Sequence, residues 1–252
     1  IFTSATLTNL ANEDLTKAYS YFIQNTMFPI NDSILSEVKY SPFAYDKHAK
    51  LFYTDDITSP SKDRGKFIDE SIDLVKKILD ISQGKALILF TSKADMNAVY
   101  TRLKALNLNY TLIKQNEISS QQQLIYKFKQ DVNSVLLGTG VFWEGISIEG
   151  IALSNLIIYK LPFPLPEPII NEKCKRSKNP LEEVLVPEMI IKLKQGVGRL
   201  LRNKTDKGIV SIIDSRLGDK SKASYKEKVW QALPIKQRTN SLKELQSFYD
   251  NL

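Results

Sequence analysis

Residues 195–202 combine side chains that recognise phosphate groups. Their sequence is Gln-Gly-Val-Gly-Arg-Leu-Leu-Arg, and they follow an apolar run with helical periodicity. If the helix continued through them, Arg199 and Arg202 would share a face, since residues three apart are neighbours on a helix. Two planar, permanently charged guanidinium groups suit the oxygens of a phosphate. Gly196 and Gly198 allow a backbone or a ligand to approach closely, at a cost in helix stability.

Four segments resemble the motifs of a known family. The pattern Gln-x-x-Gly-Arg-x-x-Arg resembles motif VI of superfamily 2 helicases. Three earlier segments, residues 4–7, 86–92 and 138–145, resemble motifs III, IV and V, in the order that the family has them. Three variants resemble the DinG branch of XPD-like helicases: Phe-Trp-Glu-Gly at 142–145, Lys-Leu-Pro-Phe-Pro at 160–164 and Asp-Ser-Arg at 214–216. The resemblance extends from residue 1 to about residue 237.

The resemblance implies a role for each motif residue. Arg199 and Arg202 would act as arginine fingers on the transferred phosphoryl group, and Gln195 would sense the γ-phosphate or position water. Glu144 would lie at the cleft between two motor domains and couple the nucleotide state to DNA binding. Further nucleotide contacts are expected from Gly145 and Gly198. Contacts with single-stranded DNA are expected from Thr91, Ser92, Gly138, Thr139 and Trp143. Coupling is expected from the motif III residues Ser4 and Thr6.

Several of these residues also have a purely structural interpretation. Small hydroxyls at strand-to-helix turns fit phosphate, because such turns present unpaired N–H groups and the positive end of a helix dipole. The same turns cap helices in proteins that bind no ligand, and this alternative applies to Ser92 and Thr139. Trp143 follows an apolar strand, so its ring either stacks on a base, a contact worth ~1–3 kcal/mol, or packs in the core.

The nucleotide-binding half of a helicase motor is not recognisable in this sequence. ATP hydrolysis by such motors needs a Gly-x-x-x-x-Gly-Lys-Ser/Thr loop and an Asp-Glu box that holds Mg²⁺, and the chain contains neither. Gly84 and Lys85 are the nearest match to the Gly-Lys of that loop, but Ala86 occupies the position of its Ser or Thr. We therefore expect ATP and Mg²⁺ to bind only together with a first RecA-like domain of the same parent chain. Residues 1–252 are interpreted as the second RecA-like domain, with residues 1–7 as the motif III segment arriving from the first.

Strand-like and helix-like segments alternate along the chain. This rhythm predicts an α/β fold, a RecA-like domain with a mainly parallel sheet flanked by helices. Expected strands lie at about 50–54, 86–91, 110–113, 134–138, 155–160 and 208–213, and expected helices at about 13–23, 66–81, 94–106, 120–130, 187–201 and 241–249. Residues 161–187 interrupt the alternation, because four prolines exclude regular structure from the first part and a short basic helix is expected over 169–178. This region is predicted to be a proline-rich and helical excursion.

Composition narrows the class of protein further. The single cysteine, Cys174, excludes an internal disulfide framework and an iron–sulfur cluster ligated by cysteines of this segment alone. The sequence has a single histidine, His48, in a polar stretch without partners for a triad or a metal site, which argues against a histidine-based hydrolase. No apolar run approaches the ~20 residues needed to span a bilayer, so no membrane partner and a cytoplasmic location are expected. Residues 171–252 carry 18 Lys and Arg against 10 Asp and Glu, an excess that would attract a polyanion.

The resemblance implies the C-terminal motor domain of an ATP-dependent, 5′ to 3′ DNA helicase that is inactive as a fragment. One alternative is a nucleic-acid-binding or regulatory helicase-like module of an exonuclease fusion protein without unwinding activity. A second alternative is a domain that has kept the motifs but lost motor activity. The sequence upstream in the parent distinguishes them, since a Gly-Lys-Thr loop favours the motor and an acidic exonuclease set favours the fusion.

Overall fold

The computed structural model describes residues 8, 14–32, 35, 37, 43–116, 118–143, 148 and 152–252. The chain divides into two compact units. Unit 1 comprises Ile1–Pro42, Pro162–Gln195 and Ser224–Pro234, and unit 2 comprises Phe43–Leu161, Gly196–Ala223 and Ile235–Leu252. The excursion predicted from the prolines falls in unit 1, and the predicted strands fall in unit 2.

Unit 2 is built on a seven-stranded sheet whose strand order is β3-β4-β2-β5-β6-β1-β7. Every adjacent pair runs parallel, which confirms the predicted fold class. The strands are β1 (Ala49–Tyr53), β2 (Ala86–Phe90), β3 (Leu112–Lys114), β4 (Val135–Thr139), β5 (Asn155–Ile158), β6 (Gly208–Ile212) and β7 (Arg238–Thr239). The central strands are apolar without alternation because both of their faces are covered.

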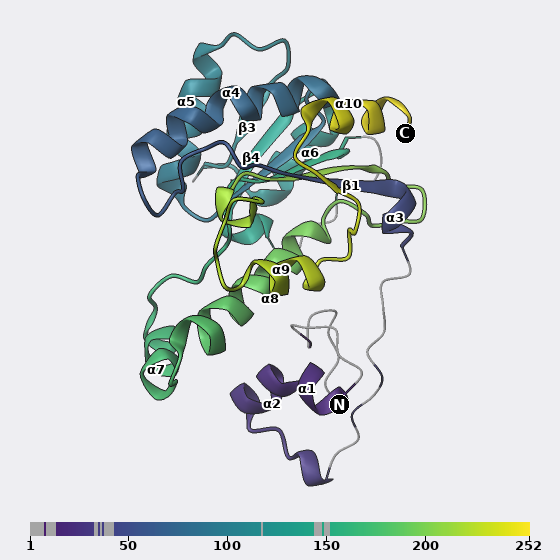
Figure 1. Ribbon diagram of the computed structural model, residues 1–252. Coiled ribbons are helices and arrows are strands. Elements are labelled where there is room, and N and C mark those ends of the chain that lie inside the picture. Colours follow the sequence, from purple (N-terminus) through teal and green to yellow (C-terminus); the bar gives the residue numbers. More distant parts are fainter. Residues whose placement is uncertain are drawn as a thin grey trace. The chain divides into compact units, whose positions relative to one another are not determined.

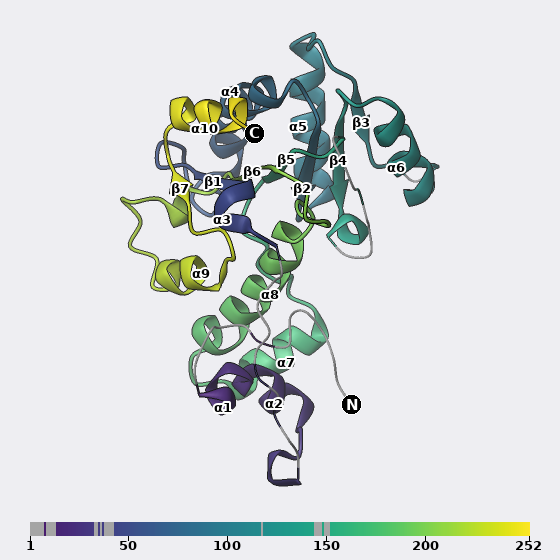
Figure 2. The same cartoon turned by 90° about the vertical axis from the view of Figure 1, so that its right-hand side faces the viewer.

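One face of this sheet is covered by α4 (Arg64–Ser82), α5 (Lys93–Ala105) and α10 (Leu242–Asp250), as Figure 1 shows. Ile88 and Phe90 point to that side and join a core cluster with Val75 and Val99. Helix α6 (Gln121–Gln130) lies at the β3–β4 end of the sheet (Figure 2). Short helical turns complete the unit: α3 (Tyr45–His48), η2 (Gly140–Phe142) and η4 (Ser215–Leu217).

Local sequence signals explain where the main helices begin. Asp63 caps α4 by accepting from the N–H of Lys66, and Gln83 ends the helix in the left-handed region at φ 53°. Ser120 and Gln123 form a reciprocal capping box at the start of α6. These caps satisfy N–H groups that the first turn of a helix leaves unpaired.

Unit 1 is helical in the part of the chain that the structure describes. Its helices are α1 (Leu15–Ala18), α2 (Ser20–Thr26), α7 (Pro168–Arg176), α9 (Lys226–Ala232) and most of α8 (Val186–Val197), with the 3₁₀ turn η1 (Ile30–Asp32) and the π-helical turn η3 (Leu181–Leu185). Helix α7 confirms the short basic helix predicted within the excursion, and Pro168 stands in its first turn, where a missing N–H is harmless. None of the helices described here combines the length and hydropathy needed to cross a bilayer.

Five details differ from the expectations. The helix expected over 187–201 ends at Val197, and the helix expected over 13–23 is divided into α1 and α2. The strand expected at 110–113 is β3, at Leu112–Lys114. Strand β7 was not predicted, because it has only two residues and is defined by its pairing with β1. Helix α9 was not predicted either.

Candidate functional site

The motif IV residues Thr91 and Ser92 follow the carboxyl end of β2, where open α/β sheets place ligands. Ser92 is the N-cap of α5, and its hydroxyl oxygen accepts from the N–H of Asp95 at 3.3 Å. This contact uses an acceptor lone pair, so it is compatible with donation by the same hydroxyl. Thr91 precedes it and is half-buried. The capping role of Ser92 is therefore established, and its role toward DNA stays a prediction.

Trp143 connects motifs IV, V and VI within unit 2. Its side chain is fully buried, and the indole Nε1 donates to the carbonyl oxygen of Phe90 at 2.8 Å. The backbone carbonyl oxygen of Trp143 accepts from Nε of Arg199 at 3.0 Å. The ring also covers Gly196, where an added Cβ would lie 2.8 Å from Trp143 Cζ3. The sequence left base stacking and core packing open for this ring, and the structure shows core packing, because neither face of the ring is exposed to a base.

The two motif VI arginines do not share a helix face, which corrects the first expectation. Helix α8 ends at Val197, and Arg199 lies in the turn that follows, with its N–H bonded to the carbonyl of Gly196 at 2.9 Å. Gly196 and Gly198 weaken the helix here, because glycine costs ~1 kcal/mol in a helix relative to alanine. Gly198 itself is half-buried in this turn.

Arg202 lies in a loop that is held by two side chains. The carboxylate of Asp206 accepts from the backbone N–H groups of Arg202 and Asn203 at 2.8 and 2.9 Å. The side-chain oxygen of Asn203 accepts in return from the N–H groups of Thr205 and Asp206, both at 2.9 Å. Asp206 is buried, with 6 % of its surface exposed. The main chain at Arg202 is thus set by these reciprocal bonds and not by a helix.

The motif V residues Gly138 and Thr139 end the buried strand β4. Gly138 is needed for packing, because a Cβ there would lie 2.5 Å from the ring of Phe142. Thr139 is directed at Gln115, whose side-chain oxygen accepts from both the N–H and the hydroxyl of Thr139, at 2.7 and 3.1 Å. Sequence reasoning missed Gln115, whose only local signal is its place directly after β3.

Two buried carboxylates anchor the strand ends that lead out of β5 and β6. Asp95 pairs with Nε of Arg64 at 2.7 Å and with Nζ of Lys160 at 2.6 Å. Asp214 accepts from the N–H of Leu161 at 2.9 Å and from two nitrogens of the Arg216 guanidinium at 2.8 and 2.6 Å. Because a buried carboxylate is costly unless it is paired, these contacts give the Lys-Leu and Asp-Ser-Arg segments a structural role.

The remaining motif residues are placed only in part. Gln195 lies in the last turn of α8 and is half-buried. Its neighbour Lys194 donates from Nζ to the carbonyl oxygen of Thr8 at 2.8 Å, and burial lowers the pKa of this ammonium. Four predicted site residues lie outside the described residues: Ser4, Thr6, Glu144 and Gly145.

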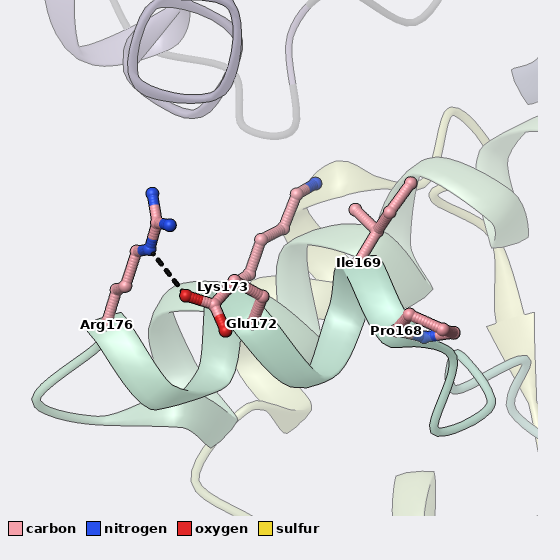
Figure 3. A pocket seen from close by; sticks show the side chains of 5 residues that line it. All are labelled: Pro168, Ile169, Glu172, Lys173 and Arg176. Atoms are coloured by element: carbon pink, nitrogen blue, oxygen red, sulfur yellow. Dashed lines mark hydrogen bonds and ion pairs between the residues drawn. The ribbon is translucent and has the colours of Figure 1, made fainter.

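Ion pairs occupy part of the basic C-terminal third. Lys173 pairs with Glu188 at 2.7 Å, and Arg176 pairs with Glu172 at 3.0 Å. Both basic residues border an open groove of about 380 Å³ along α7 (Figure 3), whose described lining is Pro168, Ile169, Glu172, Lys173 and Arg176. Because both partners of each pair lie in residues 171–252, these ion pairs leave the excess of 18 Lys and Arg over 10 Asp and Glu unchanged.

The described residues contain no group of three or more His, Cys, Asp or Glu side chains that could hold a metal ion. The buried carboxylates are engaged elsewhere, since Asp95 and Asp214 bind cationic side chains and Asp206 binds backbone N–H groups. We assign no residue of the described chain to Mg²⁺.

Comparison with known proteins identifies the family to which this chain is related. The profile of the Helicase C-terminal domain family matches residues 75–236. The chain is 32% identical to the ATP-dependent DNA helicase YoaA of Haemophilus influenzae over 258 aligned residues, which cover all of this chain and 38% of that protein. It is 34% identical to the 3′-5′ exonuclease DinG of Bacillus subtilis over 81% of this chain and 22% of that protein.

A solved structure of an XPD helicase has the same fold. It superimposes with a TM-score of 0.58 at 22% identity, covering 73% of this chain and 34% of the other. The chain thus spans well under half the length of these relatives. Its sheet and helices are those of a helicase C-terminal domain.

Proposed function

This chain belongs to the Helicase C-terminal domain family of the DinG and XPD-like branch, and we propose that it is the second RecA-like motor domain of an ATP-dependent DNA helicase. The observation that carries this proposal is Trp143, which joins the carboxyl end of β2, the motif V turn and the motif VI turn. A motor domain has to hold these segments in register, because nucleotide and DNA act on different ones.

ATP binds between this domain and a first RecA-like domain of the same parent. Arg199 and Arg202 stabilise charge on the transferred phosphoryl group, and Gln195 senses the γ-phosphate or positions water. Glu144, Gly145 and Gly198 complete the nucleotide side of the cleft. Mg²⁺ supplies charge neutralisation at the phosphates when bound, and its ligands belong to the first domain. The bond between Arg199 and the Trp143 carbonyl supports this assignment, because it sets the direction of the guanidinium.

Single-stranded DNA crosses the carboxyl edge of the sheet. Thr91, Ser92 and Thr139 offer hydroxyl and backbone donors to its phosphates, and Gly138 precedes Thr139 at the end of β4. Trp143 supports this surface from beneath. Ser4 and Thr6 couple the two motor domains. The contact of Lys194 with Thr8 supports this role, because Lys194 lies beside motif VI in the sequence and the carbonyl oxygen that it binds belongs to the residue directly after motif III. The motor moves 5′ to 3′ on DNA, as the resemblance to the DinG branch implies.

The test uses the full-length protein that contains this domain. Its ATPase rate should rise when single-stranded DNA is added, and it should separate a duplex with a 5′ single-stranded tail faster than one with a 3′ tail. A protein whose ATPase rate is the same with and without single-stranded DNA would contradict the motor proposal. Faster separation of the 3′-tailed duplex would contradict the polarity alone.

A second candidate function rests on the B. subtilis relative, whose name is that of an exonuclease. In that case this domain is a nucleic-acid-binding or regulatory module of a nuclease fusion protein. Degradation of single-stranded DNA by the full-length protein with metal ions but without ATP, together with no duplex separation, would favour this candidate. The same assay on the domain alone should show no nuclease activity under either proposal.

A further inference from the structure

Gln115 and Thr139 form a contact that the motif pattern does not anticipate. Both the backbone N–H and the hydroxyl of Thr139 donate to a single oxygen, Oε1 of Gln115. Gln115 is held in place by its own backbone, because its N–H donates to the carbonyl oxygen of Leu137 at 2.9 Å. The contact therefore lies between the edge strand β3 and the end of β4.

The two donors of Thr139 converge on one oxygen of Gln115, and a phosphate oxygen could accept from the same two donors. A charged oxygen accepts hydrogen bonds that are shorter and roughly twice as strong as those to a neutral amide. A phosphate that reached Thr139 would thus bind more strongly to the same donors than the carboxamide does. Without any acceptor, the buried donors of Thr139 would be left unsatisfied, which destabilises the folded domain.

The surroundings allow this exchange. Thr139 has 7 % of its surface exposed, whereas the covering Gln115 is only half-buried. The next residue, Gly140, has φ 50°, and apart from Gly140 and its two chain neighbours no atom of the described residues lies within 4 Å of the position that a Cβ would take there. Rotation of the Gln115 side chain would open Thr139 toward this space.

We propose that Gln115 is a positioning residue that holds the two Thr139 donors in the DNA-free state and is displaced by a backbone phosphate of single-stranded DNA. This inference rests on the proposed function, since it takes Thr139 as a DNA contact. Gln115 keeps the donors aligned and satisfied while no DNA is bound. Its neutral amide is weak enough as an acceptor to be replaced by an anion.

The test measures binding of a fluorescent oligo-dT strand to the full-length protein without nucleotide, by anisotropy. Gln115→Met keeps the side-chain length but removes the acceptor of both hydrogen bonds, so affinity should rise at least about fivefold, the factor that corresponds to ~1 kcal/mol for one competing hydrogen bond. Gln115→Glu places a carboxylate on the same donors and repels phosphate, so affinity should fall by about tenfold or more. The charge-matched control is Gln121→Glu, because Gln121 contacts the carbonyl of Val141 at 3.3 Å in the same region but does not touch Thr139.

Thr139→Val separates failure of this inference from failure of the proposed function. If Thr139→Val weakens binding and neither Gln115 variant changes it, Thr139 is a DNA contact and the role of Gln115 is wrong. If Thr139→Val binds like the wild type, the DNA site itself is wrong, and the inference fails with it. Equal losses with Gln115→Glu and Gln121→Glu would show a general charge effect and would also overturn the inference. A thermal melt of each variant identifies any that is unfolded, and Gln115→Glu still tests the proposal if Gln115→Met does not fold.

Discussion

Nε of Arg199 donates to the carbonyl oxygen of Trp143 at 3.0 Å, across 56 positions of sequence. A planar guanidinium whose Nε–H is engaged has its plane and direction fixed. Trp143 is itself fixed, because its indole is buried and bonded to Phe90. The direction of Arg199 is therefore determined by the motif V main chain and not by a helix.

Removal of either motif VI arginine should reduce ATP turnover by the full-length protein. Arg202→Ala and Arg199→Ala should each lower kcat far more than nucleotide affinity, by as much as the ~10³–10⁵ that arginine fingers contribute elsewhere. The double variant should lose less than the sum of both effects, because both groups act on one phosphate. Arg199→Lys should not restore the rate, since an ammonium lacks the Nε–H that binds Trp143.

Steady-state ATPase with and without single-stranded DNA measures this effect beside a thermal melt. Arg176→Ala is the matched control, because Arg176 is an exposed guanidinium on α7 that pairs with Glu172. If Arg202→Ala melts and hydrolyses ATP like the wild type, Arg202 is not an arginine finger.

Gly196→Ala should destabilise the domain despite the higher helix propensity of alanine. The propensity gain is at most ~1 kcal/mol, whereas overpacking costs ~1–3 kcal/mol, and the new Cβ would lie 2.8 Å from Cζ3 of Trp143, which has no room to move. Gly65→Ala is the matched control. Its Cβ would meet only Asp63 Oδ1 at 3.5 Å, so the free energy of unfolding should rise, by less than the roughly 0.5–1 kcal/mol of a mid-helix position because Gly65 lies in the first turn of α4. Urea denaturation measures both, and a stabilised Gly196→Ala variant would contradict the packing.

Asp206→Ala should impair turnover through Arg202. It removes the acceptor of two backbone N–H groups, which should lower the free energy of unfolding by about 1–3 kcal/mol and reduce kcat as the loop loses its geometry. Asp206→Asn keeps one acceptor oxygen and should recover most of the kcat. If Asp206→Ala lowers the free energy of unfolding but leaves kcat unchanged at a temperature where the variant is fully folded, Asp206 stabilises the loop without positioning Arg202.

The 252-residue chain alone should not hydrolyse ATP. The phosphate-binding loop and the acidic box are absent from its sequence, so the arginines have no bound phosphoryl group to act on. Phosphate release is measured with protein purified away from contaminating ATPases. A rate above the buffer blank that Arg202→Ala abolishes would contradict the prediction that a first domain is required.

Affinity of the same chain for single-stranded DNA should fall as salt increases. Each neutralised phosphate contributes ~0.7 to the slope of log affinity against log salt for single strands. Lys204→Ala, next to motif VI, should reduce that slope if it contacts a phosphate. Lys173→Ala should have little effect, because Lys173 is already paired with Glu188. A slope of zero would exclude an electrostatic DNA surface in the domain.

The sequence alone determined most of the strands and main helices and the parallel sheet that carries the motifs. Apolar runs such as 86–90 and 135–137 are buried on both faces, and this burial leaves a pattern that can be recognised locally. Helix α7 was also predictable, because prolines before it and its basic residues are local signals. The motif order sufficed to predict the family.

Only the tertiary structure decided what individual site residues touch. The end of α8 at Val197 separates Arg199 from the helix, and the Asp206 carboxylate that holds the Arg202 loop acts through backbone N–H groups. The packing of Trp143 against Gly196 and the bond from Thr139 to Gln115 join residues that are 53 and 24 positions apart in sequence. Periodicity reports which face a side chain takes, but a hydrogen-bond partner at that separation depends on how strands and turns are brought together in space.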